Sequence, residues 1–105
     1  MTGEQERIVR RVREELERLY GNRFIGLIFY GSRVRGDARA DSDYDFLAVL
    51  EPVGRRWDEL MRLSDLGFDL MQELGVYVSL RPVALGDLAS ETLFMENVRR
   101  EGLRA

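Results

Sequence analysis

A Gly-Ser pair and two aspartates lie within fifteen residues of each other in this chain. Gly31 and Ser32 follow an apolar run, and Asp43 and Asp45 introduce the next one. Because alternate side chains of a strand share a face, this spacing would present both carboxylates with Cα atoms about 6–7 Å apart. Such oxygen ligands suit Mg²⁺, and water molecules and phosphates complete the coordination of this ion. A Gly-Ser turn leading into a helix adds free N–H groups and a hydroxyl, which bind phosphate. The pattern predicts a nucleoside triphosphate site.

These residues resemble the Gly-Ser…Gly…Ser-Asp-x-Asp signature of the polymerase-β-type nucleotidyltransferases. The matching segments are Gly31-Ser32, Gly36 and Ser42-Asp43-Tyr44-Asp45. The chain is similar to the minimal, antitoxin-type members of that superfamily, the MNT domains, which are often encoded beside a HEPN protein. Its tail, Asn97 to Gly102, is similar to the closing segment of such domains. The resemblance implies one nucleotidyltransferase-like domain over residues 1–105.

The resemblance also implies a role for each matched residue. Asp43 and Asp45 would be the catalytic carboxylates and the ligands of Mg²⁺ or Mn²⁺. The substrate would be ATP or another nucleoside triphosphate, from which a nucleoside monophosphate (AMP in the case of ATP) passes to a hydroxyl acceptor. That hydroxyl could belong to a partner HEPN toxin. The expected nucleotide-binding residues are Gly31, Ser32, Arg33, Arg35 and Ser42.

Three details of this set come from the residue types. A guanidinium pairs bidentately with phosphate oxygens, so either Arg33 or Arg35 is expected to approach the triphosphate, and the sequence leaves the choice open. Ser42 is expected to hydrogen-bond within its loop and so to position Asp43. Gly31 is expected to be a glycine because a side chain would block close approach of the backbone.

The strand after the long helix lacks an acid that catalytic members of the resembled family carry there. The expected strand spans residues 76–81 and contains neither Asp nor Glu, and alignment on Gly75 puts Ser79 at the third-acid position. A hydroxyl is a poor base and a weak metal ligand. Carboxylates that could reach the site from elsewhere are Glu51, Asp69 and Glu73.

Two functions therefore remain open at this point. The first is a transferase, slow or dependent on one metal ion. The second is a nucleotide-binding antitoxin with weak or no turnover, which neutralises its partner by complex formation alone. Either function implies a partner protein or a homo-oligomer, because a chain of 105 residues has little room for an acceptor-binding domain.

Composition excludes several other classes of protein. Without cysteine or histidine the chain has no disulfide, no zinc site built on those ligands and no histidine base. A net charge of −3 argues against extended nucleic-acid binding. No apolar run approaches the roughly 18–20 residues of a membrane span, so we expect a cytoplasmic protein without membrane association.

The periodicity predicts a mixed α+β fold, with a sheet of about three to four strands flanked by helices. The expected elements are a helix over residues 4–20, a strand Phe24–Tyr30, one or two helical turns over 33–37, a strand Tyr44–Leu50, a helix over 55–74 that Gly67 loosens, a strand Val76–Arg81 that Pro82 stops, and a last helix capped by Asp87 and containing Leu88, Leu93, Phe94 and Val98.

Helical spacing also assigns side chains to the core and to the surface. The positions expected in the core, rather than in a base-stacking surface, are Trp57, Met61, Phe68 and Met71. Glu14, Glu15 and Glu17 are expected on a solvated face of the first helix, with neighbouring arginines as partners.

Overall fold

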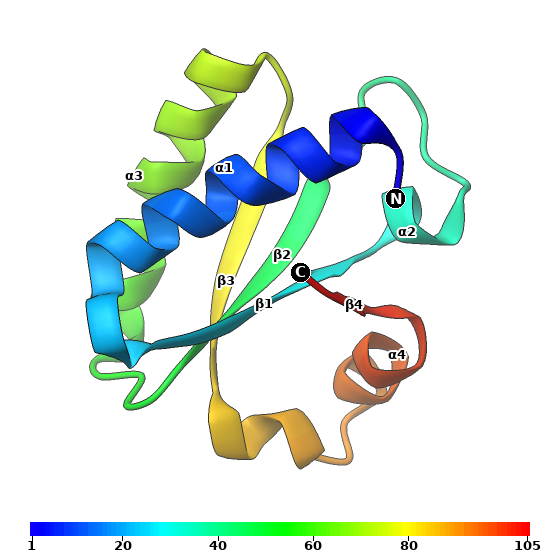
Figure 1. Cartoon of the computed structure of the whole chain (residues 1–105). Helices are drawn as coiled ribbons and strands as arrows, with labels where there is room; N and C mark the ends of the chain where they lie inside the picture. The colour runs from blue at the N-terminus through cyan, green and yellow to red at the C-terminus, as the bar shows by residue number, and fades with distance from the viewer.

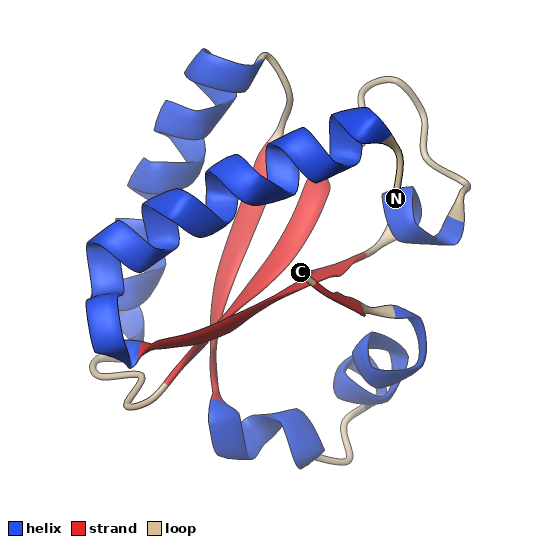
Figure 2. Cartoon of the chain, viewed as in Figure 1, coloured by secondary structure: helices blue, strands red, loops and turns tan.

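The computed structural model describes all residues from Met1 to Ala105 and contains a four-stranded mixed sheet between helices (Figures 1 and 2). The strand order is β3-β2-β1-β4. β1 is antiparallel to β2 and β4, and β2 is parallel to β3. The elements are α1 (Gly3–Tyr20), a 3₁₀ turn (Gly21–Arg23), β1 (Phe24–Tyr30), α2 (Ser32–Arg35), β2 (Tyr44–Leu50), α3 (Arg56–Leu74), β3 (Val78–Ala84), a 3₁₀ helix (Leu85–Ala89), α4 (Leu93–Glu101) and β4 (Leu103–Arg104). The expected α+β class is confirmed.

Helices α1 and α3 cover one face of the sheet, and α4 packs on the other (Figure 1). Between α1, α3 and the sheet lies the main core, which includes Val12, Phe29, Phe46 and Leu63. A smaller cluster lies under α4 and includes Leu47 and Val98. None of the helices combines the length and the apolar character that crossing a bilayer requires.

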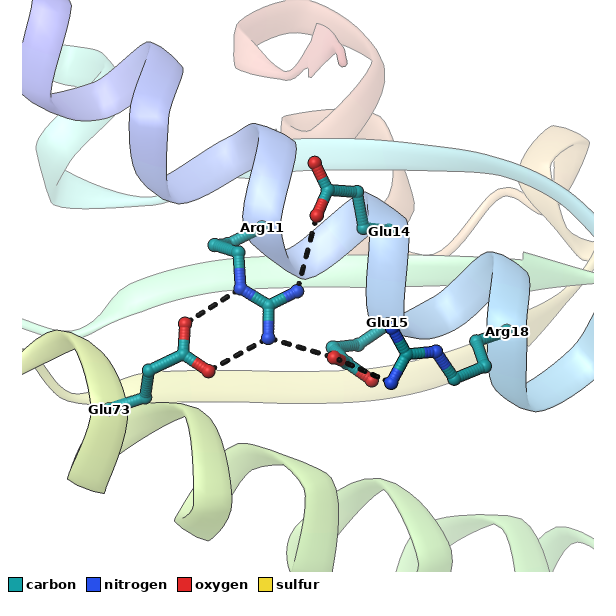
Figure 3. Close-up of polar contacts among 5 residues, drawn as sticks. All are labelled: Arg11, Glu14, Glu15, Arg18 and Glu73. Atoms are coloured by element: carbon teal, nitrogen blue, oxygen red, sulfur yellow. Dashed lines mark hydrogen bonds and ion pairs between the residues drawn. The ribbon is translucent and has the colours of Figure 1, made fainter.

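α1 begins with a capping box between Thr2 and Gln5 and is tied to α3 by ion pairs. Arg11 contacts Glu14 at 3.3 Å, Glu15 at 2.8 Å and Glu73 of α3 at 2.6 Å (Figure 3). The expected solvated, charge-paired face of α1 is therefore confirmed. Glu73, which the sequence left as a carboxylate that could reach the site, instead joins the two helices.

The expected burial of Trp57, Met61 and Phe68 on α3 is wrong, whereas Met71, expected with them, is partly buried. Trp57 is 71% exposed, Phe68 58% and Met61 47%. Helical spacing shows that residues share a face without showing which face packs, and the sheet contacts a second apolar stripe that contains Leu63 and Leu70.

The expected loosening of α3 at Gly67 is also wrong, because the helix continues from Arg56 to Leu74 without a break. A Cβ at Gly67 would lie 3.0 Å from the carbonyl oxygen of Val78, so this glycine allows α3 to pack closely on β3. Gly75 ends the helix in the left-handed region, with φ of 73°.

The third strand begins and ends later than predicted. β3 spans Val78–Ala84, and Pro82 lies within it instead of stopping it. Because β3 is at the edge of the sheet, one side of the strand has no neighbour and the missing N–H of proline is tolerated there.

The predicted start of the last helix is wrong as well. Leu88 belongs to the short 3₁₀ helix, and α4 begins at Leu93 after Thr92, whose Oγ1 accepts a 3.2 Å hydrogen bond from the N–H of Met95. Asp87 is therefore not the cap. Sequence periodicity also did not identify β4 as a separate strand, because its two residues are too short to show alternation.

Candidate functional site

Two residues expected at the site, Asp45 and Ser79, lie in one row across the sheet, and Tyr30 lies in the same row. Asp45 of β2 pairs in register with Tyr30 of β1 on one side and with Ser79 of β3 on the other. Directly opposed residues of neighbouring strands point to the same face. Here that face is the α4 side, because Tyr44 and Phe46 on either side of Asp45 belong to the main core. Ser79 therefore stands next to Asp45.

Asp43 lies just outside the strand rather than on it. β2 begins at Tyr44, so Asp43 is the last residue of the preceding loop and is exposed, whereas Asp45 is half-buried. Burial raises the pKa of the Asp45 carboxyl above its ordinary value, and the charge of Asp43 raises it further, while Arg81 and Arg35 oppose the shift. The two carboxylates are therefore close enough to repel each other.

Gly31 brings the backbone of the Gly-Ser turn directly against Asp45. Its φ of 91° and ψ of −164° lie in a region that only glycine adopts readily. A Cβ built at Gly31 would collide with Oδ2 of Asp45. The glycine is therefore needed for two reasons, its conformation and the close approach of a carboxylate. α2 starts at Ser32, so the first amides of its turn have no partner within the helix.

The two candidate arginines have different surroundings. Arg33 donates from Nη2 to the carbonyl oxygens of Ser42 at 2.9 Å and Ala40 at 3.2 Å, and its guanidinium lies 4.3 Å from the centre of the Tyr44 ring. These contacts hold the loop that ends at Asp43. Arg35 instead lines a cavity together with Asp45, so the geometry favours Arg35 as the phosphate-binding arginine.

Ser42 holds the same loop from within. Its Oγ accepts a 2.8 Å hydrogen bond from the N–H of Arg39, and its own N–H donates to the carbonyl of Arg39 at 3.0 Å. The expected loop hydrogen bond is confirmed. This hydrogen bond fixes the backbone immediately before Asp43.

The cavity beside Asp45 has a volume of about 450 Å³ and is closed on one side by α4. Its lining residues are Tyr30, Gly31, Ser32, Arg35, Asp45, Phe94, Asn97, Val98 and Glu101. Arg35 forms ion pairs at 3.3 Å with Asp37 and at 3.4 Å with Glu101. The expected turn and one expected aspartate thus meet at a cavity large enough to hold part of a nucleotide.

A larger cavity of about 610 Å³ lies beside β1 and β4, away from the aspartates. Its walls are mostly apolar, with Ile25, Leu85 and Val98 among them, and it contains no Asp or Glu. Size alone therefore does not identify the functional site. The smaller cavity has the carboxylate, hydroxyl and guanidinium groups that phosphate and metal chemistry require.

The donor set at the smaller cavity fits a divalent cation. Two carboxylates that repel each other, one of them half-buried, are stabilised by a cation between them. No group of three or more Asp and Glu side chains is placed to hold a metal ion, so waters and phosphate oxygens would complete the coordination. Glu51 and Asp69, the other two expected candidates, do not line this cavity.

Sequence reasoning missed the contribution of α4 to the cavity, and it missed Arg81, whose charge acts on Asp45. The α4 side chains Phe94, Asn97 and Glu101 recur at the helical spacing of one face, but nothing in the sequence shows that this face turns toward the aspartates. Arg81 follows Ser79 by two residues and so shares its face of β3. This spacing could have identified Arg81 from the sequence.

This combination of fold and motif is that of the small nucleotidyltransferases. Residues 9–99 match the family of nucleotidyltransferase domains. The chain therefore belongs to that family. A comparison with curated proteins finds no significant match.

Solved structures support the same assignment. A structure described as a minimal nucleotidyltransferase is 32% identical, with 90% of each chain covered and a TM-score of 0.55. At 16% identity the chain resembles a structure of a tri-AMPylated Shewanella oneidensis HEPN toxin in complex with its MNT antitoxin, with 95% and 70% covered and a TM-score of 0.60. A toxin–antitoxin structure with AMP-PNP is 17% identical, with 98% and 72% covered and a TM-score of 0.58. The last two similarities establish the fold alone.

Proposed function

We propose that this chain transfers a nucleoside monophosphate, AMP from ATP, to a hydroxyl group on a partner HEPN protein, in a reaction that depends on Mg²⁺. The observation that carries the proposal is the contact between Gly31 and Asp45 at the edge of a cavity that also contains Ser32 and Arg35. Membership of the nucleotidyltransferase family supports the reaction type. The HEPN partner is suggested by the MNT–HEPN complex among the structural neighbours.

Each group has a role that its chemistry suits. Asp43 and Asp45 would hold the metal ion, which when bound neutralises phosphate charge and fixes the triphosphate for in-line attack. Ser32 and the first amides of α2 would contact the terminal phosphates, and Arg35 would donate to their oxygens. Arg33 and Ser42 would act indirectly, by holding the loop that carries Asp43.

The proposed transfer balances as a simple displacement. The acceptor hydroxyl oxygen forms a bond to the α-phosphorus, and the bond from that phosphorus to the oxygen bridging to the β-phosphate breaks. Pyrophosphate leaves with the bridging oxygen and its electron pair, and the hydroxyl proton passes to solvent. Positioning and charge neutralisation account for most of the catalysis in such displacements.

The test is transfer of label from ATP labelled at the α-phosphate to a purified HEPN-type partner. We expect transfer that requires Mg²⁺ and is abolished by Asp43→Ala, with no loss in the matched control Asp65→Ala, whose carboxylate is exposed on α3 away from the cavity. Label transfer that persists in Asp43→Ala would contradict the proposal.

A second function, neutralisation of the partner by complex formation alone, is favoured by one observation. Ser79 occupies the register position next to Asp45, and no third carboxylate joins the pair. The double variant Asp43→Ala/Asp45→Ala separates the two functions. If it neutralises the partner as well as the wild type does, binding suffices; if neutralisation is lost while the complex still forms, the transferase function is supported.

A further inference from the structure

Arg81 is an arginine of β3, the strand that pairs with β2 on the Ser79 side of Asp45. It forms no ion pair, whereas Arg35 contacts both Asp37 and Glu101. Its guanidinium lies 5.9 Å from the centre of the Phe94 ring, and Phe94 lines the cavity. Arg81 is exposed and so remains accessible to a ligand.

The sheet register places Arg81 on the side of Asp45 that the Gly-Ser turn does not occupy. Gly31, Ser32 and Arg35 approach from β1, whereas Ser79 and Arg81 belong to β3 on the far side of β2. Arg81 follows the third-acid position by two residues, so its side chain leaves β3 on the same face as Ser79. Arg81 pairs in register with Leu47, which follows Asp45 by two residues and so lies on the same face of β2.

We infer that Arg81 is a phosphate-binding residue on β3. Its positive charge takes the place of a second metal ion, which a third carboxylate would otherwise bind. This inference rests on the proposed function. A guanidinium needs no acidic ligands and makes directed hydrogen bonds to phosphate oxygens. Arginines neutralise the charge of phosphoryl transfer in the same way in other enzymes. Arg81 takes no part in the bonds that form and break.

The two arginines then contact different phosphates. Arg35, next to the Gly-Ser turn, contacts the terminal phosphates. Arg81, on the opposite side of the aspartates, contacts the α-phosphate, which is the group under attack. Removal of Arg81 should therefore weaken binding of AMP as well as of the triphosphate, whereas removal of Arg35 should weaken the triphosphate only.

The experiment is calorimetric titration of the full chain with AMP-PNP and with AMP, in the presence of Mg²⁺. We expect Arg81→Gln to weaken both by about ten- to a hundredfold, the effect of losing one charge-assisted contact. Arg81→Lys should recover part of the affinity. Arg35→Gln should weaken AMP-PNP alone. The matched control is Arg55→Gln, an exposed arginine without an ion pair at the other end of β2, which should bind as the wild type does.

A second readout is the number of Mn²⁺ ions bound with AMP-PNP, measured by electron paramagnetic resonance. We expect one ion per nucleotide in the wild type and two in the variant Ser79→Asp/Arg81→Gln, which restores the acid and removes the guanidinium. The inference is overturned if Arg81→Gln binds both ligands within twofold of the wild type, if only AMP-PNP is weakened, or if the wild type binds two ions. Failure of the wild type to bind AMP-PNP would instead remove the proposed function, and this inference with it.

Discussion

The two faces of the sheet are filled to different extents. On the α1 and α3 side, fourteen buried residues form one continuous cluster. On the α4 side the corresponding cluster has five, and the space that they leave contains the cavity beside Asp45. The first face accounts for most of the stability of the fold. The second has room for a ligand because its packing is incomplete, and it carries the charged groups that packing would exclude.

The largest expected effect compares the same substitution on the two faces. Leu27 and Leu47 are each 2% exposed, and they belong to the main core and the α4 cluster respectively. We expect Leu27→Ala to lower the free energy of unfolding by about 4 kcal/mol and Leu47→Ala by about 2 kcal/mol, because a sparsely packed site can relax around the lost atoms. Denaturant unfolding measures both. Equal losses would show that the two faces are packed alike.

The turn at Gly31, between β1 and α2, should be the next most sensitive point. Gly31→Ala should lower the free energy of unfolding by roughly 1–3 kcal/mol, because alanine disfavours the φ of 91° and its Cβ collides with Asp45. The matched control is Gly36→Ala, which has a similar φ of 87° but open space around the added Cβ. Its loss should be the smaller one, and thermal unfolding of both variants compares them. A control that lost as much would leave no role for the contact with Asp45.

A small gain in stability is expected when the site loses its charge. Asp45→Asn should raise the free energy of unfolding of the metal-free protein, because burial and Asp43 raise the pKa of this carboxyl and so disfavour its ionised form in the folded state. The gain should be present at neutral pH. It should vanish as the pH falls through the pKa of Asp45, where the wild-type carboxyl is also neutral. Unfolding curves at a series of pH values measure this, with the exposed Asp65→Asn as the control. A destabilised Asp45→Asn would contradict the account.

The smallest effect is expected on the outer surface of α3. Trp57→Ser should change the free energy of unfolding by no more than about 0.5 kcal/mol, because the side chain is 71% exposed. A loss of several kcal/mol would restore the interpretation from sequence that this residue belongs to the core. The same unfolding measurement decides between them.

The sequence was most informative where a pattern depends on neighbouring residues alone. It predicted the helix over residues 4–20, the strand Phe24–Tyr30, the strand Tyr44–Leu50 and the end of α3 at Gly75, because each is set by local conformational preference. The Gly31 turn was predicted for a similar reason. The sequence did not show that Gly31 lies directly against Asp45.

The errors have a common physical origin, which is that the position of an element in the tertiary structure was unknown. Pro82 stays within β3 because that strand is at the sheet edge, and Trp57 is exposed because a different stripe of α3 meets the sheet. The same limit concealed the functional face of α4. Residues as distant in sequence as Asp45 and Glu101 line one cavity only after α4 has packed on the sheet.

The most direct test is a crystal structure of the chain with Mn²⁺ and AMP-PNP, in which the anomalous signal of manganese locates the ion. We predict one ion between Asp43 and Asp45, with the triphosphate against the turn at Gly31 and within reach of Arg35 and Arg81. A nucleotide in the larger cavity beside β1 and β4, or an ion bound away from both aspartates, would contradict the account.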